Sequence, residues 1–264
     1  MPNSTSIREN QTQGRIGCVL RRITAVFALL TLAACATSQP GAAINDPYEG
    51  ANRQIHAFNK GLDRAILRPA GQIAAATPVE VTGPITNFAD NVGLPNMIVN
   101  GLLQGDIGGT ATNTIRFVLN TTVGIGGLFD PAGAIGLDEQ STDFGETLAV
   151  WGVGEGAYIE MPVFGPSTQR DAVGTVVDLI LDPLNAVGTA KQLQYGTATR
   201  AADLAIRRGQ LFDTIDSVLY ESADSYAQTR LVYLQNRRFE LGEDQPATEE
   251  IDPFAGDLSL EGFE

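Results

Sequence analysis

Residues that usually carry catalysis are sparse in this sequence. His56 is the only histidine among 264 residues, so any Ser–His–Asp or Cys–His apparatus would have to use it. The sequence contains no Gly-x-Ser-x-Gly nucleophile motif and no P-loop, and a second imidazole for a zinc site is missing. Gly152-x-Gly154-x-Gly156 lacks the strand before it and the helix after it that a dinucleotide-binding turn requires. The sequence therefore predicts neither an enzyme nor a cofactor.

Cys35 has the clearest chemical role, that of an acyl acceptor. It ends the lipobox pattern Leu32-Ala33-Ala34-Cys35, which closes an uncharged run over 23–34 that follows three arginines. Twelve residues are too few to cross a membrane, but they suit the apolar region of a signal peptide. We expect a lipoprotein signal peptide over 1–34 and a lipidated linker over 35–44. The alternative is an ordinary secretory signal that happens to end in a cysteine.

The chain after the signal is strongly acidic. Four arginines and one glutamate precede Cys35, which leaves 13 of the 17 Lys and Arg against 30 of the 31 Asp and Glu, a net charge of −17. Such a surface repels nucleic acid, so we expect no nucleic-acid partner. Nine carboxylates and no Lys or Arg lie between Glu240 and Glu264. This composition predicts an acidic disordered tail over 241–264, either a floppy terminus or a segment that orders on a partner.

The apolar spacing predicts a mainly α fold with almost no sheet. Asp46 is expected to cap the first helix and Pro69 to end it. Two short helices should follow, one around 85–92 and one from Pro95 to Gly105. Further helices are expected from Asp106 to about Asn120, from Ser167 or Thr168 onward, over 184–219 and over 224–239.

The middle of the chain is unusual in composition. Residues 107–137 carry only two charges, Arg116 and Asp130, and Val123–Gly136 is apolar yet rich in Gly and Pro. A soluble protein would bury such a segment in its core. The competing interpretation is a segment at membrane depth, where irregular backbone must pack against protein or line a cavity. Arg116 could meet a phosphate head group, or it could pair with a carboxylate such as Asp130.

Short motifs follow one another in a fixed order between Asn45 and Phe239. The main ones are Asn45-Asp46-Pro47-x-Glu49-Gly50-x-Asn52-Arg53, Phe58-Asn59, Arg68-Pro69, Ile85-Thr86-Asn87-Phe88, Leu103-Gln104-Gly105-Asp106, Arg116-Phe117-x-Leu119-Asn120-Thr121, Gly124-x-Gly126-Gly127-x-x-Asp130-x-Ala132-Gly133, Asp143-Phe144-Gly145, Gly152-Val153-Gly154-x-Gly156-x-Tyr158 and Pro162-x-x-Gly165-Pro166-Ser167. In this order and spacing the chain resembles the MlaA/VacJ family of outer-membrane lipoproteins. The resemblance covers nearly all of the mature chain and implies one helical domain over 45–240.

The resemblance also implies a shape and a function. It implies a ring-shaped bundle of amphipathic helices, with glycine-rich irregular hairpin segments, that lies in the periplasmic leaflet of the outer membrane against a porin trimer. A central channel would take phospholipid mislocalised to the outer leaflet and pass it to a soluble periplasmic carrier. An inner-membrane ABC transporter complex would receive the lipid next. The alternative is a non-transporting, porin-bound scaffold that recruits periplasmic partners through its acidic tail.

If the chain is such a channel, its lining or gating residues are expected in two places. The first is the helix that begins near residue 46, and the second is the glycine-rich hairpin together with the lone cation near it. The candidates are Asn52, Phe58, Asn59, Arg116, Gly124, Gly126, Gly127, Phe129 and Asp130. For Phe58 the alternative is plain core packing, and for the glycines it is a tight turn without lipid contact.

Overall fold

The computed structural model describes residues 44–181 and 190–242. The predicted signal peptide, Cys35 and all but the last residue of the predicted linker lie outside these residues. So does the predicted acidic tail, apart from its first two residues.

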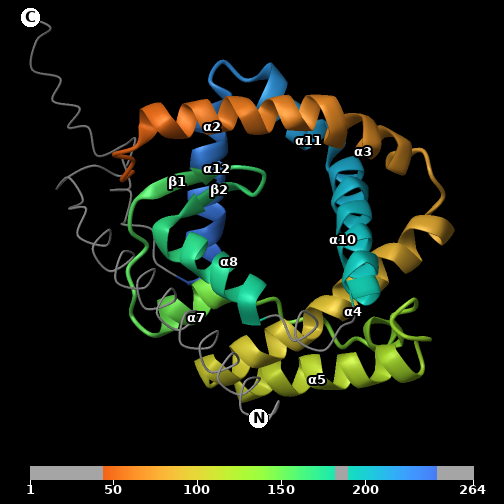
Figure 1. Ribbon diagram of the computed structural model, residues 1–264. Coiled ribbons are helices and arrows are strands. Elements are labelled where there is room, and N and C mark those ends of the chain that lie inside the picture. Colours follow the sequence, from red (N-terminus) through yellow and green to blue (C-terminus); the bar gives the residue numbers. More distant parts are fainter. Residues whose placement is uncertain (1–43, 182–189, 243–264) are drawn as a thin grey trace, which may run out of the picture.

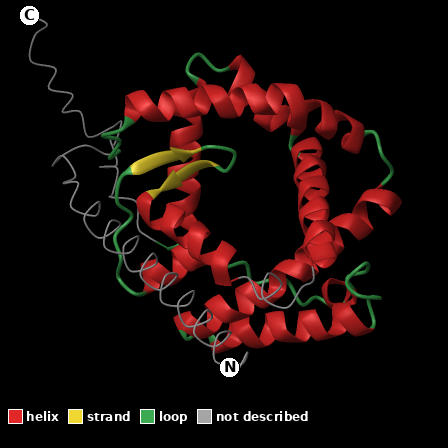
Figure 2. Ribbon diagram, in the orientation of Figure 1, coloured by secondary structure: helices red, strands yellow, loops and turns green. Residues whose placement is uncertain are grey.

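Helices dominate the described chain, and the sheet in it is a single two-stranded hairpin (Figure 2). The elements are, in order, α2 (Glu49–Leu62), the π-helical turn η1 (Asp63–Leu67), α3 (Arg68–Ala75), α4 (Val79–Gln104), α5 (Ile107–Thr122), α6 (Pro131–Ala134), α7 (Phe144–Val150), β1 (Tyr158–Met161), β2 (Gly165–Thr168), α8 (Gln169–Leu181), α10 (Ala190–Gln210), α11 (Phe212–Asp216), the π-helical turn η2 (Ser217–Glu221) and α12 (Ser225–Glu240). The prediction of a mainly α fold with almost no sheet is confirmed.

Two predictions about the first helix were wrong. Asp46 does not cap it, because α2 begins at Glu49 with no side-chain cap. The Asp46 carboxylate instead accepts hydrogen bonds from Asn52, at 2.9 Å, and from Tyr226 and Arg230 of α12. Pro69 does not end the helix either. It lies in the first turn of α3, directly after the π-helical turn η1, and a proline is tolerated in a first turn because its N–H would have no helical partner there.

The two short helices predicted over 85–105 are one long helix, α4, with Pro84 and Pro95 inside it. Each proline removes one backbone hydrogen bond. Contacts of α4 with α5, α7 and α10 hold the helix together across these breaks. Gly105 ends α4 in the left-handed conformation, and Asp106 caps α5 through the Gly109 N–H, as the sequence predicts.

The contacts between elements form a closed circuit. α2 contacts β1, and β1 pairs with β2, which contacts α8; the circuit then passes through α7, α4, α10 and α3 back to η1 and α2. In Figure 1, α2 and α3 run along the top, α10 along the right and α4 and α5 along the bottom, with α7, α8 and the hairpin on the left. The ribbons leave the middle of this view open.

Polar and apolar side chains are distributed unlike those of most water-soluble proteins. Among the described residues, 17 polar or charged side chains are buried against seven hydrophobic ones. Large apolar side chains lie exposed on α3, α4, α5 and α8, including Ile73, Val79, Ile107 and Ile180 at about 70% exposure. Helix packing in this molecule therefore relies heavily on buried hydrogen bonds, and the apolar faces of several helices are left uncovered.

Candidate functional site

The glycine-rich segment after α5 forms a tight hairpin in which left-handed backbone is needed. Gly126 and Gly127 have φ angles of +72° and +92°, and the β-branched Ile125 also has a positive φ, of +55°. A Cβ on Gly127 would lie 2.6 Å from two atoms of the Asn91 side chain on α4. A Cβ on Gly124 would lie 2.4 Å from the Phe129 carbonyl oxygen. The glycines thus let this hairpin approach α4 and fold back on itself.

Arg116 and Asp130, the two charges of the apolar middle, bind each other. Arg116 Nη2 lies 3.1 Å from Asp130 Oδ2, and Nη1 donates to the Leu137 carbonyl. Asp130 also accepts from Asn120 Nδ2 at 2.8 Å and from the Gly133 N–H at 2.9 Å. Burial acts to raise the pKa of Asp130, but these hydrogen bonds and Arg116 outweigh it and hold the pKa below its ordinary value. Arg116 therefore pairs with the Asp130 carboxylate, which is one of the two partners expected for it.

The surface around this buried ion pair is apolar. Arg116 is 6% exposed, whereas Phe129 is 55% exposed. Other exposed apolar side chains of α5 and the following hairpin are Ile107, Ile115, Val118, Val123, Ile125, Leu128 and Ile135. The uncharged segment is therefore not a buried core segment, because its large side chains face outward.

Two of the candidate residues on α2 hold the β1–β2 hairpin. Asn52 is buried; its Nδ2 donates to the Tyr158 carbonyl at 3.2 Å and its Oδ1 accepts from the Glu160 N–H at 3.0 Å. Asn59 Nδ2 donates to the Met161 carbonyl at 3.0 Å. Asn52 and Asn59 thus dock the hairpin on α2. Phe58, which lies between them in the sequence, is 55% exposed and is not a core residue.

His56 has the neighbours of a hydrolase triad but not its surroundings. Nδ1 lies 3.2 Å from Glu160 Oε1, and Nε2 lies 3.1 Å from Ser225 Oγ. Backbone N–H groups next to the serine could serve as oxyanion donors. They are already used, because the Ala227 and Tyr226 N–H groups bind Asp224, the cap of α12. With His56 only 5% exposed, the arrangement is that of a satisfied buried histidine joining α2, β1 and α12.

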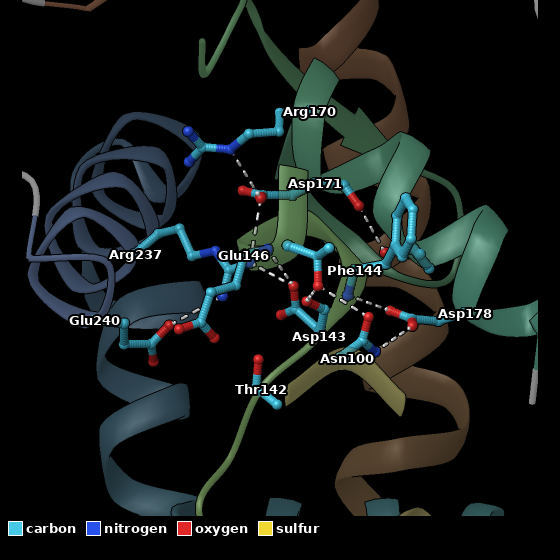
Figure 3. A network of polar contacts seen from close by, with 12 residues as sticks. Asn100, Thr142, Asp143, Phe144, Glu146, Arg170, Asp171, Asp178, Arg237 and Glu240 are labelled. Atoms are coloured by element: carbon cyan, nitrogen blue, oxygen red, sulfur yellow. Dashed lines mark hydrogen bonds and ion pairs between the residues drawn. The ribbon is translucent and has the colours of Figure 1, made fainter. Parts of the chain in front are cut away.

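A second polar network joins four helices (Figure 3). Asp178 of α8 accepts from Asn100 Nδ2 of α4 and from the Phe144 N–H of α7, both at 3.0 Å. On the α12 side, Arg237 binds Asp143 at 2.7 Å and Asp171 at 3.2 Å. Burial acts to raise the pKa of Asp171, but Arg237 and hydrogen bonds from Tyr233 and Thr168 hold the pKa below its ordinary value. This network fixes α7 and α8 between α4 and α12.

The structure separates the predicted site residues into two groups. Arg116 of α5 lies together with the hairpin glycines, Phe129 and Asp130 that follow this helix, whereas Asn52, Phe58 and Asn59 lie on α2 beside the β hairpin. Asn91, Asn120 and Glu160 contact these groups and were not among the predicted site residues. No local signal identifies them, because each binds a partner that is either distant in the sequence or part of a segment without regular secondary structure.

Neither a metal-binding cluster nor a membrane-spanning helix occurs in the described part of the chain. Residues 44–181 and 190–242 contain no group of three or more His, Cys, Asp or Glu side chains that could hold a metal ion. Within the same residues, no helix combines the length and the apolar character needed to cross a membrane.

The fold and the site define a helical protein with a polar interior and uncovered apolar helix faces. A family model described as "MlaA lipoprotein" matches residues 44–240. The chain therefore belongs to the MlaA lipoprotein family.

Similar proteins come from several bacteria. Several are named "Intermembrane phospholipid transport system lipoprotein MlaA", among them the two that follow. That of Escherichia coli K12 is 35% identical over 223 residues, 80% of this chain and 83% of the relative. That of Haemophilus influenzae is 30% identical over 233 residues, 84% of this chain and 90% of the relative. An uncharacterised protein of Rickettsia bellii is 36% identical over 196 residues, 74% of this chain and 76% of the relative.

A solved structure also matches. It comes from work described as "Structural basis for maintenance of bacterial outer membrane lipid asymmetry" and is 33% identical in sequence. The TM-score is 0.59, and the match covers 74% of this chain and 98% of the solved chain.

Proposed function

We propose that this protein is an outer-membrane lipoprotein that removes mislocalised phospholipid from the outer leaflet and passes it toward the inner membrane. The observation that carries this proposal is the uncovered apolar surface on α3, α4, α5 and α8 around a polar interior. Exposed apolar area of this extent is typical of proteins that contact lipid or apolar partners. The names of the relatives from E. coli and H. influenzae, which refer to phospholipid transport, support the same function.

The energetic need for such a protein is large. A diacyl phospholipid that leaves a membrane exposes on the order of 30 methylenes to water, at a cost of about 24 kcal/mol if each contributes about 0.8 kcal/mol. A partly apolar passage removes most of this barrier without making or breaking a bond. In our proposal the closed circuit of elements surrounds that passage, and the glycine-rich hairpin after α5 forms its movable lip.

The proposal includes a location and partners. Lipid on Cys35 would hold the protein to the periplasmic leaflet of the outer membrane, where its apolar helix faces would meet acyl chains and a porin trimer. A soluble periplasmic carrier would receive the phospholipid and deliver it to an ABC transporter complex of the inner membrane. Energy would enter at that complex, since this chain has no P-loop.

Deletion of the gene in the source bacterium tests the proposed function. Phospholipid left in the outer leaflet forms patches that detergents cross, so we expect the deletion strain to be detergent-sensitive and to have more phospholipid at its surface. The intact gene should restore both properties. Normal detergent resistance and an unchanged surface phospholipid content in the deletion strain would refute transport. Phospholipid co-purifying with the mature protein separates a transporter from a scaffold, which should carry none.

A further inference from the structure

The turn between β1 and β2 extends into the middle of the circuit of elements (Figure 1). In the hairpin Met161 pairs with Gly165, so Pro162, Val163 and Phe164 form the turn. In the sequence this stretch belongs to the motif Pro162-x-x-Gly165-Pro166-Ser167. The structure makes it the part of the β hairpin farthest from the strand ends that join the rest of the fold.

The two apolar side chains at the end of this turn are uncovered. Val163 is 62% exposed and Phe164 is 60% exposed. No described residue therefore buries them, although the strands behind them are well packed, with Tyr158 and Thr168 at 1% and 0% exposure. An aromatic and an aliphatic side chain side by side in water are unfavourable unless an apolar ligand or partner covers them.

The backbone of the turn is held in a conformation that its own sequence disfavours. Val163 has a φ of +72°, in the left-handed region that β-branched residues rarely adopt. Such a conformation persists when surrounding contacts impose it, and it often marks functional positions. The contact here is Asn59, whose Oδ1 accepts from the Val163 N–H at 2.8 Å and whose Nδ2 donates to the Met161 carbonyl at 3.0 Å. α2 thus fixes the position of the turn.

We propose that the Pro162–Phe164 turn is an acyl-chain contact on the lipid passage and that Asn59 is the residue that positions it. This inference rests on the proposed transport function. The occupant is an acyl chain, not a head group, because the turn offers two apolar side chains and no polar one. The turn lies in the middle of the circuit of elements, so it would lie beside any lipid that moves through the passage. Its side chains are apolar, whereas the contacts behind it are buried and polar.

The double substitution Val163→Asn with Phe164→Ser tests this role. Asparagine tolerates left-handed backbone, so the turn should keep its shape while losing its apolar surface. We expect the variant to accumulate and fold as the wild type does, yet to leave the deletion strain detergent-sensitive and rich in surface phospholipid. A turn with only a structural role would predict the opposite, namely full restoration of detergent resistance.

Phe239→Ser is the matched control, because Phe239 is also an exposed aromatic residue, at 83% exposure near the end of α12, and is not part of the Pro162–Phe164 turn. It should restore resistance fully. If the double variant restores resistance as well, the inference is overturned while the proposed function stands. If the deletion strain is not detergent-sensitive at all, the proposed function itself has failed.

A photo-crosslinking residue at position 164 provides a second measurement, which does not depend on the double variant folding. In intact cells we expect a phospholipid adduct on the full-length protein, identified by mass spectrometry. Asn59→Ala should reduce that adduct severalfold, because the Val163 N–H and the Met161 carbonyl then lose the side chain that holds the turn in place. Absence of the adduct, or an adduct that Asn59→Ala leaves unchanged, would refute the assignment.

Discussion

At the scale of single residues, the glycine-rich hairpin depends on two different properties of glycine. Gly126 and Gly127 share left-handed backbone, but they differ in the space around them. No atom lies within 4 Å of a Cβ placed on Gly126, whereas a Cβ on Gly127 would overlap Asn91. Conformational freedom is needed at both positions, and close approach to α4 only at the second.

This difference predicts unequal costs for the same substitution. Gly126→Ala should lower the free energy of unfolding by about 1 kcal/mol, the cost of a left-handed alanine. Gly127→Ala should cost about 1–3 kcal/mol more, because the methyl group must also displace Asn91. Chemical denaturation of the two purified variants measures the difference. Equal losses would mean that the hairpin moves away from α4 without cost.

At the scale of elements, a buried ion cluster joins the two π-helical turns. Arg208 of α10 binds Asp63 of η1 at 2.8 Å and Asp216 of α11 at 2.5 Å. Tyr220 of η2 donates to the same Asp63 at 2.8 Å, and burial together with this hydrogen bond raises the pKa of Tyr220 to about 12. The side chain of Arg208 is 4% exposed, so its removal would leave the buried Asp63 without its cation, whereas Asp216 would keep Arg68.

We therefore expect substitutions of two neighbouring arginines, Arg208 and Arg207, to lower the free energy of unfolding by different amounts. Arg208→Met should lower the free energy of unfolding by about 3–5 kcal/mol, the usual cost of breaking a buried ion pair by removing one partner. Arg207→Met is the control, because Arg207 is 49% exposed and binds Asp203 and Asp90 near the surface. Its loss should cost about 1 kcal/mol or less. Comparable losses in thermal and chemical denaturation would contradict the role given to the cluster.

The attachment of α12 should depend on pH through Asp171. Its pKa in the folded protein lies below that of an unfolded chain, about 3.9. Its contribution to stability is therefore fully present above pH 4 and is lost as the pH falls through the lower folded value. Asp171→Asn should remove this contribution, so that unfolding free energy depends less steeply on pH below 4. Asp213→Asn, at an exposed position on α11, should leave the pH dependence unchanged.

Features that depend on residues close together in the sequence could be predicted well. Features that depend on distant residues could not. The caps at Asp106 and Asp224 were predictable because each binds an N–H three residues later. The role of Asp46 was not, since its partners Tyr226 and Arg230 lie about 180 residues away. The merging of two expected helices into α4 also depended on neighbours that periodicity does not reveal.

The candidate site shows the same division between local and distant information. The hairpin glycines and the Arg116–Asp130 pair could be predicted from composition and from the resemblance. Asn59 was predicted as a lining or gating residue, but its contacts with Met161 and Val163 could not be, because no short motif connects α2 with the β hairpin.

At the scale of the whole molecule, the uncovered apolar faces predict membrane binding without the lipid anchor. Replacing residues 1–35 with an ordinary cleaved secretory signal would produce a chain without Cys35. We expect this chain to stay in the membrane fraction after washing with high salt and to be released by detergent. A soluble periplasmic protein exported by the same signal is the control. Recovery of the unlipidated chain in the soluble fraction would show that the anchor is the main membrane contact.

The contacts of Asp46 also constrain when the protein can finish folding. If the predicted signal exports the chain from its N-terminal end, Asp46 emerges long before Tyr226 and Arg230, which bind it in the finished structure. In that case α2 cannot complete its contacts until the last helix has also emerged. Contacts of such large sequence separation form slowly, and uncovered apolar faces promote aggregation in the interval. We therefore expect folding of an exported chain to benefit from a partner that shields these helix faces until α12 is available.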